Sequence, residues 1–227
     1  MTGFHDRERR RERRRRRDEI AARAARAWFL GEHDSIADAI DESCGVDAKR
    51  HATRPPRPGD GRVRLHLRAC AESALGREGR LQRVAEVLGH AVAAMEALAS
   101  PPIAARTTLA GRATRGQVED LLAGGGRLHL RTETGVSIGG LAACLVEAGF
   151  DEPSFDSFEA RGPTSGCGRL HRLSTGRDGV AISLVRCPPA QIVPGDFDLV
   201  RGQRATVLDL QSLRCRVGAL LEGRDPF

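Results

Sequence analysis

Apolar residues recur every three or four positions in several parts of the chain, a spacing typical of helices with one buried face. The clearest example is a predicted helix over residues 70–99, whose apolar stripe consists of Leu81, Val84, Leu88, Ala91, Met95 and Leu98. Packing of this stripe against a domain core is the simpler interpretation, and a dimer seam is the alternative. Shorter helices are expected over residues 18–30, 36–42, 116–123, 138–148 and 209–221.

Local signals mark where several of these helices begin. Ser137 and Asp209 are predicted to cap the helices that follow them, and Thr114 with Gln117 forms a capping box for a short helix. Asp34 or Ser35 is expected to cap a helix that ends near Gly45.

The segment that follows Asp34 also resembles a known motif. SIADAIDESCGVDAKR resembles the helix-turn-helix of TetR-type repressors, which pair Ile-Ala-Asp with a later Gly-Val. The match is out of register by one residue, and it places Asp41 where the motif has a small buried side chain. We favour an ordinary pair of helices for this segment.

Strict alternation of apolar and polar residues predicts strands. Residues 62–68 and 127–131 alternate in this way, and both contain Arg-Leu-His-Leu-Arg. A duplicated βα unit is one explanation of this repeat, and chance repetition in an Arg- and Leu-rich chain is the one we favour. Residues 169–175 and 180–186 flank Gly-Arg-Asp-Gly and predict a β-hairpin, and residues 197–200 predict an edge strand.

Proline and glycine divide the chain. Residues 52–61 (ATRPPRPGDG) hold three Pro and two Gly, which is typical of a linker. We therefore predict an Arg-rich helical arm (1–30), a short helical segment with a Pro-rich linker (31–61), and an α+β domain (62–227). The expected fold class is α+β: the basic helical arm precedes a domain with a small, mostly antiparallel sheet, and the helices over 70–99, 138–148 and 209–221 pack on one face of that sheet.

The positive charge of the protein is concentrated in the arm. Residues 1–30 contain 11 Arg and five acidic residues, which accounts for the whole formal net charge of +6. Residues 31–227 contain 25 basic and 25 acidic residues and are neutral overall. A basic surface that binds an acidic or polyanionic partner is therefore expected in the arm.

The core of the arm is a run of nine arginines. We predict that they contact the phosphates of nucleic acid, or another polyanion; they are Arg7, Arg9, Arg10, Arg11, Arg13, Arg14, Arg15, Arg16 and Arg17. A nuclear-localisation signal has the same composition, and a solvated helical extension with a Glu12–Arg16 pair is the structural alternative. No aromatic residue is interleaved in the run, so base stacking by it is not expected.

Composition excludes several classes of protein. No apolar stretch approaches the roughly 18 residues of a membrane span, and no apolar segment follows the arginines as a secretory signal requires, so we expect a soluble intracellular protein, cytoplasmic or nuclear/nucleoid. The six Cys form no Cys-x-x-Cys, and the only Lys lies outside any phosphate-binding loop. We therefore predict structural thiols, no metal site and no cofactor.

The second half resembles part of another family. LLAGGGRLHLRT and LAACLVEAGF are similar to the closing strand and helix of class I methyltransferases that use S-adenosylmethionine. The resemblance implies a Rossmann-like sheet, but the strand and glycine-rich turn that bind the cofactor in that family are not found upstream. No cofactor residue can therefore be assigned from it.

Two residue pairs have the residue types of catalytic sites. Asp196 and Asp198 would share a face of a strand and suit Mg²⁺-dependent nucleotidyl transfer, and Cys167 and His171 have the types of a nucleophile and its base. A solvated turn and an exposed loop thiol are the simpler interpretations, so we predict no catalytic residue. The leading hypothesis is a non-enzymatic protein whose arm contacts nucleic acid or another polyanion. Its neutral domain then serves assembly, with a homo-oligomer as one form, or partner binding. A methyl- or nucleotidyltransferase is the alternative.

Overall fold

The computed structural model describes residues 2–33, 35–51, 53–115, 118–122, 127–160, 168–189, 197–198, 203–204 and 206–227. The chain divides into two compact units. Unit 1 comprises Met1–Arg80 with Leu122–Gly125, and unit 2 comprises Leu81–Leu121 with Gly126–Phe227.

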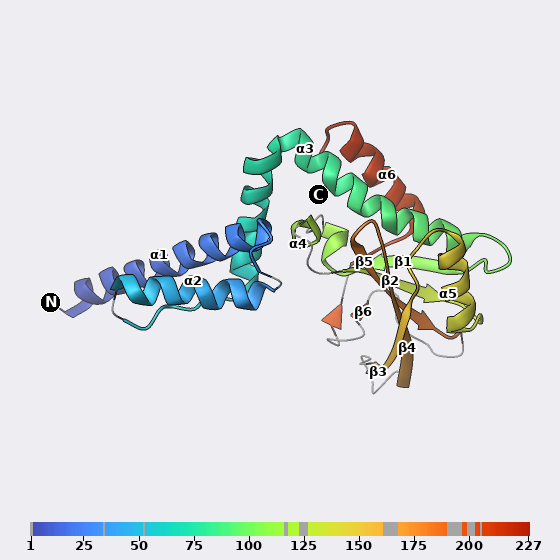
Figure 1. Cartoon of the computed structure of the whole chain (residues 1–227), viewed down its shortest axis with the longest axis horizontal. Helices are drawn as coiled ribbons and strands as arrows, with labels where there is room; N and C mark the ends of the chain where they lie inside the picture. The colour runs from blue at the N-terminus through green and yellow to red at the C-terminus, as the bar shows by residue number, and fades with distance from the viewer. Residues whose placement is uncertain are drawn as a thin grey trace. The chain divides into compact units, whose positions relative to one another are not determined.

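Helices and a mixed sheet make this an α+β fold, as the sequence predicts (Figure 1). The helical segments are α1 (Thr2–Phe29), α2 (Ile36–His51), α3 (Asp60–Ala99), a 3₁₀ turn (Arg112–Arg115), α4 (Glu119–Leu122), α5 (Ile138–Glu147) and α6 (Leu210–Leu221). The strands are β1 (Arg106–Ala110), β2 (Leu128–Glu133), β3 (Ser154–Ala160), β4 (Gly168–Arg177), β5 (Val180–Cys187), β6 (Phe197–Asp198), β7 (Gln203–Arg204) and β8 (Val207–Leu208). None of the helices in the described part of the chain combines the length and the hydropathy that crossing a lipid bilayer requires.

Unit 1 is built from α1, α2 and the beginning of α3, and Figure 1 shows α1 and α2 side by side. Its core is a cluster of buried side chains: Ile20, Ala21, Ala24, Ala25, Trp28, Ala39, Ile40, Cys44, Val63 and Leu67. The second half of α1 is Ala-rich because it must lie close to two other helices, and the helix ends as predicted just before Gly31, whose φ is 74°.

The helix after Ser35 is longer than the sequence suggests. Ser35 caps it as expected, since its Oγ accepts a hydrogen bond from the Asp38 backbone N–H at 3.2 Å. The predicted end near Gly45 is wrong, because α2 continues through this glycine to His51. Cys44 and Asp47 on either side of Gly45 are buried, and their packing offsets the roughly 1 kcal/mol that a helical glycine costs. A single helix here shows that the ordinary pair of helices favoured from the sequence is wrong, and it also removes the resemblance to repressors.

The predicted strand over residues 62–68 is wrong, because these residues form the start of α3. Val63, Leu67 and Ala71 are buried at four-residue spacing, as on one face of a helix, whereas Leu65 is 70% exposed. Alternation over so short a segment suits a strand and a helix equally well, and the apolar surface of α1 decides between them.

The second part of α3 follows a break at Gly76, where φ is 71° and ψ is 170°. The apolar stripe predicted for a helix ending at Ala99 lies in this part, and each of its six residues is at most 1% exposed within the chain. The stripe is therefore core, and the alternative of a dimer seam is wrong.

Unit 2 contains a six-stranded sheet in the order β3-β4-β5-β2-β1-β8. Only β2 and β5 pair in parallel, and all other neighbours are antiparallel, as predicted. A sheet of this kind contradicts the Rossmann-like sheet that the methyltransferase resemblance implies. β4 and β5 form the expected hairpin, with a two-residue turn at Asp178 (φ 50°) and Gly179 (φ 78°).

One face of this sheet carries the core of unit 2. Leu109, Leu130, Leu184 and Leu173 are register partners across four strands, and each is at most 1% exposed. α5 contacts β4 and α6 contacts β1. Ser137 and Asp209 cap α5 and α6 as predicted, accepting backbone N–H bonds from Gly140 and Ser212.

Two smaller predictions in unit 2 need correction. The expected edge strand over residues 197–200 is β6, which pairs with β7 in a separate two-stranded sheet. Of the helix expected over residues 116–123, the described residues form α4, and Val118 before it is not helical. Thr114 donates its hydroxyl to the Gly111 carbonyl, while Gln117 lies outside the described residues. The sequence pattern does not predict the strands β1, β3, β7 and β8.

Candidate nucleic-acid interface

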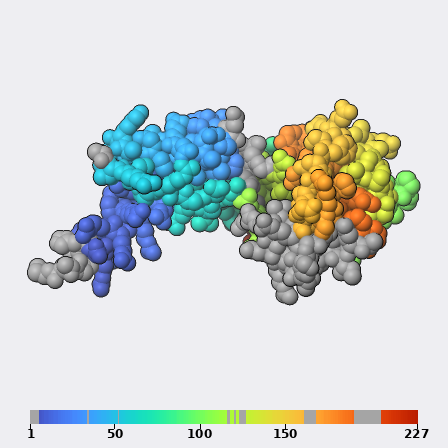
Figure 2. All heavy atoms as spheres, turned by 90° about the horizontal axis from the view of Figure 1, so that it is seen from below, coloured from blue at the N-terminus to red at the C-terminus, as the bar shows by residue number. Residues whose placement is uncertain are grey.

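The nine arginines of the predicted run all lie on α1, and the helix separates them into two sets. One set lies on one side of the helix around a hollow of about 410 Å³, and we call it the arginine face: Arg7, Arg10, Arg11, Arg13, Arg14 and Arg17. All six side chains are exposed, and no acidic group among the described residues pairs with any of them. In Figure 2 the side chains of this part of α1 project from the body formed by α2 and the start of α3.

The three remaining arginines are engaged by acidic side chains. Arg9 lies 3.4 Å from a carboxylate oxygen of Asp6, and Arg15 lies 3.1 Å from Glu12 and 3.6 Å from Glu19. Arg16 is bound to Asp47, so the Glu12–Arg16 pair expected from the sequence is not the contact that forms. Contact of any of the nine with nucleic acid stays a prediction, but the six unpaired guanidiniums are the ones available for it.

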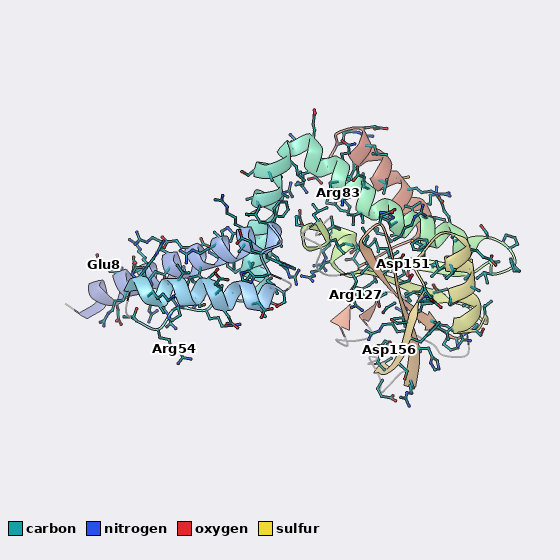
Figure 3. The ribbon with its side chains drawn as sticks, in the orientation of Figure 1. Glu8, Arg54, Arg83, Arg127, Asp151 and Asp156 are labelled. Carbon is teal, nitrogen blue, oxygen red and sulfur yellow. The ribbon has the colours of Figure 1, made fainter. Side chains whose placement is uncertain are left out.

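The three glutamates of α1 lie away from the arginine face. Glu8, Glu12 and Glu19 follow one another at intervals of four and seven residues, which places them on a single stripe. Figure 3 shows Glu8 on the side of α1 away from α2. The positive potential of the arm therefore belongs to one face of a helix and is not spread evenly around it.

A buried ion pair fixes this helix on α2. The Arg16 guanidinium donates to both carboxylate oxygens of Asp47, at 2.6 and 3.4 Å, and to the Thr53 hydroxyl at 2.9 Å. The Asp47 side chain is only 4% exposed, and the hydrogen bond from Arg16 lowers the pKa of its carboxyl while burial opposes that change. The pair sets which side of α1 turns toward α2, and so it orients the arginine face.

A second anchor ties α1 to α3. The carboxylate of Asp18 accepts a hydrogen bond from Arg62 at 2.8 Å and lies 3.0 Å from the His66 ring nitrogen. The hydrogen bond from Arg62 is the main cause of the lowered pKa of the Asp18 carboxyl, and the hydrogen bond with His66 is the next largest. Together with the Asp47 pair, this contact holds α1 on both of its neighbours.

One pattern in the sequence indicates the Asp47 anchor. Ile40, Cys44 and Asp47 follow at intervals of four and three residues, so the acid lies within an apolar stripe of α2. An acidic residue in such a stripe indicates a buried ion pair, because a carboxylate is rarely buried without a partner. The identity of that partner depends on how α1 packs on α2.

The tryptophan that follows the arginine run on α1 is not available for stacking. Trp28 is 4% exposed in the core of unit 1, and the Arg64 guanidinium lies 5.5 Å from the centre of its ring. Phe29 is partly buried against the same cluster.

The described structure does not test either candidate catalytic pair of the second half, because one residue of each pair lies outside the described residues. Cys167 and Asp196 lie outside the described residues, and so does the side chain of Asp198. His171 is exposed on β4. Within the described ranges, no three His, Cys, Asp or Glu side chains form a group suited to a metal ion.

A transferase in the second half stays a prediction. Thermal stabilisation of the protein by S-adenosylmethionine, or by a nucleotide with Mg²⁺, is the result that would favour it.

Comparison with protein-family models, curated proteins and solved structures finds no match to this chain.

Proposed function

We propose that the protein binds nucleic acid, or another polyanion, through the arginine face of α1, and that its neutral second unit serves assembly or partner binding. The observation that carries this proposal is the set of six exposed arginines around one hollow, without acidic partners in the described structure. A guanidinium offers donors in a planar fork that matches a phosphate, and a row of them suits a ligand with repeating phosphates.

The distribution of charge supports the same proposal. The arm carries the whole net charge of +6, and the remainder of the chain is balanced between 25 basic and 25 acidic residues. Attraction to a polyanion is therefore a property of unit 1. Each phosphate that the arm neutralises releases counterions from the nucleic acid, so binding must weaken as salt is added.

Deletion of the arm is a poor test of this function, because α1 is also part of the core of unit 1. Removing residues 1–30 takes Ile20 and Trp28 out of that core, and loss of binding would then follow from unfolding. Substitutions that keep the helix are the better variants, and glutamine forms helices almost as well as arginine.

A pair of matched triple variants tests the proposal. The face variant replaces Arg10, Arg14 and Arg17 by Gln, and the control variant replaces Arg9, Arg15 and Arg26, which lie off the arginine face. Both remove three positive charges. Fluorescence anisotropy with a labelled nucleic acid across a salt series should show the plot of log affinity against log salt becoming shallower by about 3 in the face variant, and by much less in the control. Equal losses in the two variants, or binding by the natural protein that salt does not affect, would contradict the proposal.

A further inference from the structure

We propose that the ligand of the arginine face is double-stranded DNA, with α1 lying along the major groove and its guanidiniums on the phosphates that border the groove. This inference rests on the proposed function and specifies its ligand. It follows from the direction of the face, its rigidity, and the side chains that accompany it.

The arginine face continues the buried seam of α1. Arg7, Arg10, Arg14 and Arg17 are separated by three, four and three residues, and the same alternating intervals lead on to Ala21, Ala24 and Trp28 in the core. The six arginines therefore lie on the side of α1 that α2 and α3 cover further along the helix. From Arg7 to Arg17 the face extends about 15 Å along a straight helix.

This face is preformed, because the ion pairs of Arg16 with Asp47 and of Asp18 with Arg62 hold α1 where its arginine run meets the body of unit 1. A row of guanidiniums on a helix held in this way suits the regular array of phosphates on a duplex better than a flexible single strand. Duplex DNA carries about one negative charge per 1.7 Å of its axis, so phosphates lie within reach along the whole face.

Single-stranded nucleic acid is disfavoured because the arginine run itself contains no stacking platform. Proteins that hold single strands place bases on exposed aromatic rings. Residues 7–17 contain no aromatic residue, and Trp28 is buried beneath Arg64. Residues 7–17 therefore offer charge to the backbone and no aromatic ring to unstacked bases.

The dimensions of the helix favour DNA over duplex RNA. An α-helix with its side chains is about 10–12 Å across, which matches the roughly 12 Å width of the major groove of B-form DNA. The major groove of A-form RNA is too narrow and deep to admit it. The stripe of Glu8, Glu12 and Glu19 lies off the arginine face and so can point out of the groove.

An acidic protein is also disfavoured as the ligand of the arginine face, because the face lacks apolar anchors. Recognition of a helix by another protein relies on apolar anchors at intervals of three and four residues. Residues 7–17 contain arginine and glutamate alone, so this part of α1 presents no apolar side chain to a partner helix. A phosphate backbone requires none.

The test compares four probes against the full-length protein at one moderate salt concentration. These are a DNA duplex of about two helical turns, one of its single strands, the RNA duplex of the same sequence, and polyglutamate. We expect the DNA duplex to bind at least roughly tenfold more tightly than each of the others. The face variant should lose this preference, and the control variant should keep it. Methyl green, which occupies the major groove, should compete with the protein, whereas the minor-groove ligand netropsin should not.

The outcomes separate this inference from the proposed function. Equal, salt-sensitive binding to the three nucleic acids, or competition by netropsin alone, would overturn the assignment to the DNA major groove and leave polyanion binding intact. Tightest binding to polyglutamate would overturn the assignment in favour of an acidic protein. Failure to bind any of the four probes would overturn both.

Discussion

Replacing Asp47 by asparagine is expected to lower the free energy of unfolding of unit 1 by about 2 kcal/mol at neutral pH, because the nearly buried guanidinium of Arg16 then loses its carboxylate partner. Urea unfolding followed by tryptophan fluorescence measures this directly. Trp28 is the only tryptophan, the chain has no tyrosine, and Trp28 lies in the core of unit 1.

Asp41→Asn is the matched control for this variant. Asp41 lies on the same helix and also pairs with an arginine, Arg57, but its side chain is 62% exposed. Exposed ion pairs contribute little, so a change below about 1 kcal/mol is expected. Equal effects of the two substitutions would show that the burial of Asp47 is not what makes its pair important.

The effect of Asp47→Asn should also depend on pH. The pKa of the Asp47 carboxyl is lowered in the folded protein, chiefly by the hydrogen bond from Arg16. A group of this kind stabilises the fold fully above its unfolded pKa of about 4, and loses that contribution as the pH falls through its folded value. The difference between the natural protein and Asp47→Asn should therefore be constant near neutral pH and shrink below about pH 4. A difference that stays the same down to low pH would rule out the carboxylate as its source.

Leucine-to-alanine substitutions in the two copies of Arg-Leu-His-Leu-Arg should give contrasting results. In α3, Leu67 is fully buried and Leu65 is 70% exposed, whereas in β2 both Leu128 and Leu130 are at most 1% exposed. We expect Leu67→Ala, Leu128→Ala and Leu130→Ala each to cost about 2–5 kcal/mol, and Leu65→Ala to cost less than about 0.5 kcal/mol.

The measurements for these four variants differ by unit. Tryptophan fluorescence reports the two substitutions in unit 1, and far-UV circular dichroism during urea unfolding reports the two in unit 2. Comparable losses at Leu65 and Leu67 would contradict the helical assignment of the first copy, since a strand buries both.

This repeat also shows where prediction from sequence reaches its limit. The same five residues form a helix in α3 and a strand in β2. In α3 the buried residues are four positions apart and pack against α1, whereas in β2 they are two positions apart and pack in the core of unit 2. The helical form of the first copy depends on the apolar surface of Ile20 and Ala24, which are distant in the sequence. Segments whose local signals suffice were predicted well, such as the hairpin turn at Asp178 and Gly179 and the helix that begins after Ser137.

The strands that were missed lack an apolar pattern of their own. In β1 the buried positions are Thr107 and Leu109, and Thr107 lies within 3.0 Å of the Thr132 hydroxyl of β2, a polar contact that periodicity does not register. β3 buries only Ala160, yet it pairs with β4 over its whole length. Both strands form because a neighbouring strand presents an edge with free backbone groups.

The sequence predicts which residues form the candidate site, but not which of them are available to a ligand. The density of charge indicated nine arginines, but their division into six exposed and three engaged residues depends on helical geometry and on the position of Asp47. Arg16 and Arg17 are adjacent in the sequence, and only the first reaches α2. No property of the run by itself distinguishes them.

The placement of arginine on the buried seam of α1 also bears on self-association. A helix with apolar residues at these alternating intervals would form a coiled coil with a second copy of itself. Arginine at the same positions brings like charges together in any such dimer, and the repulsion is relieved only when salt screens it. Added salt should therefore weaken binding of the arm to a polyanion and reduce the electrostatic repulsion between two arms. Polyanion binding and self-association through this one face should then depend on salt in opposite directions.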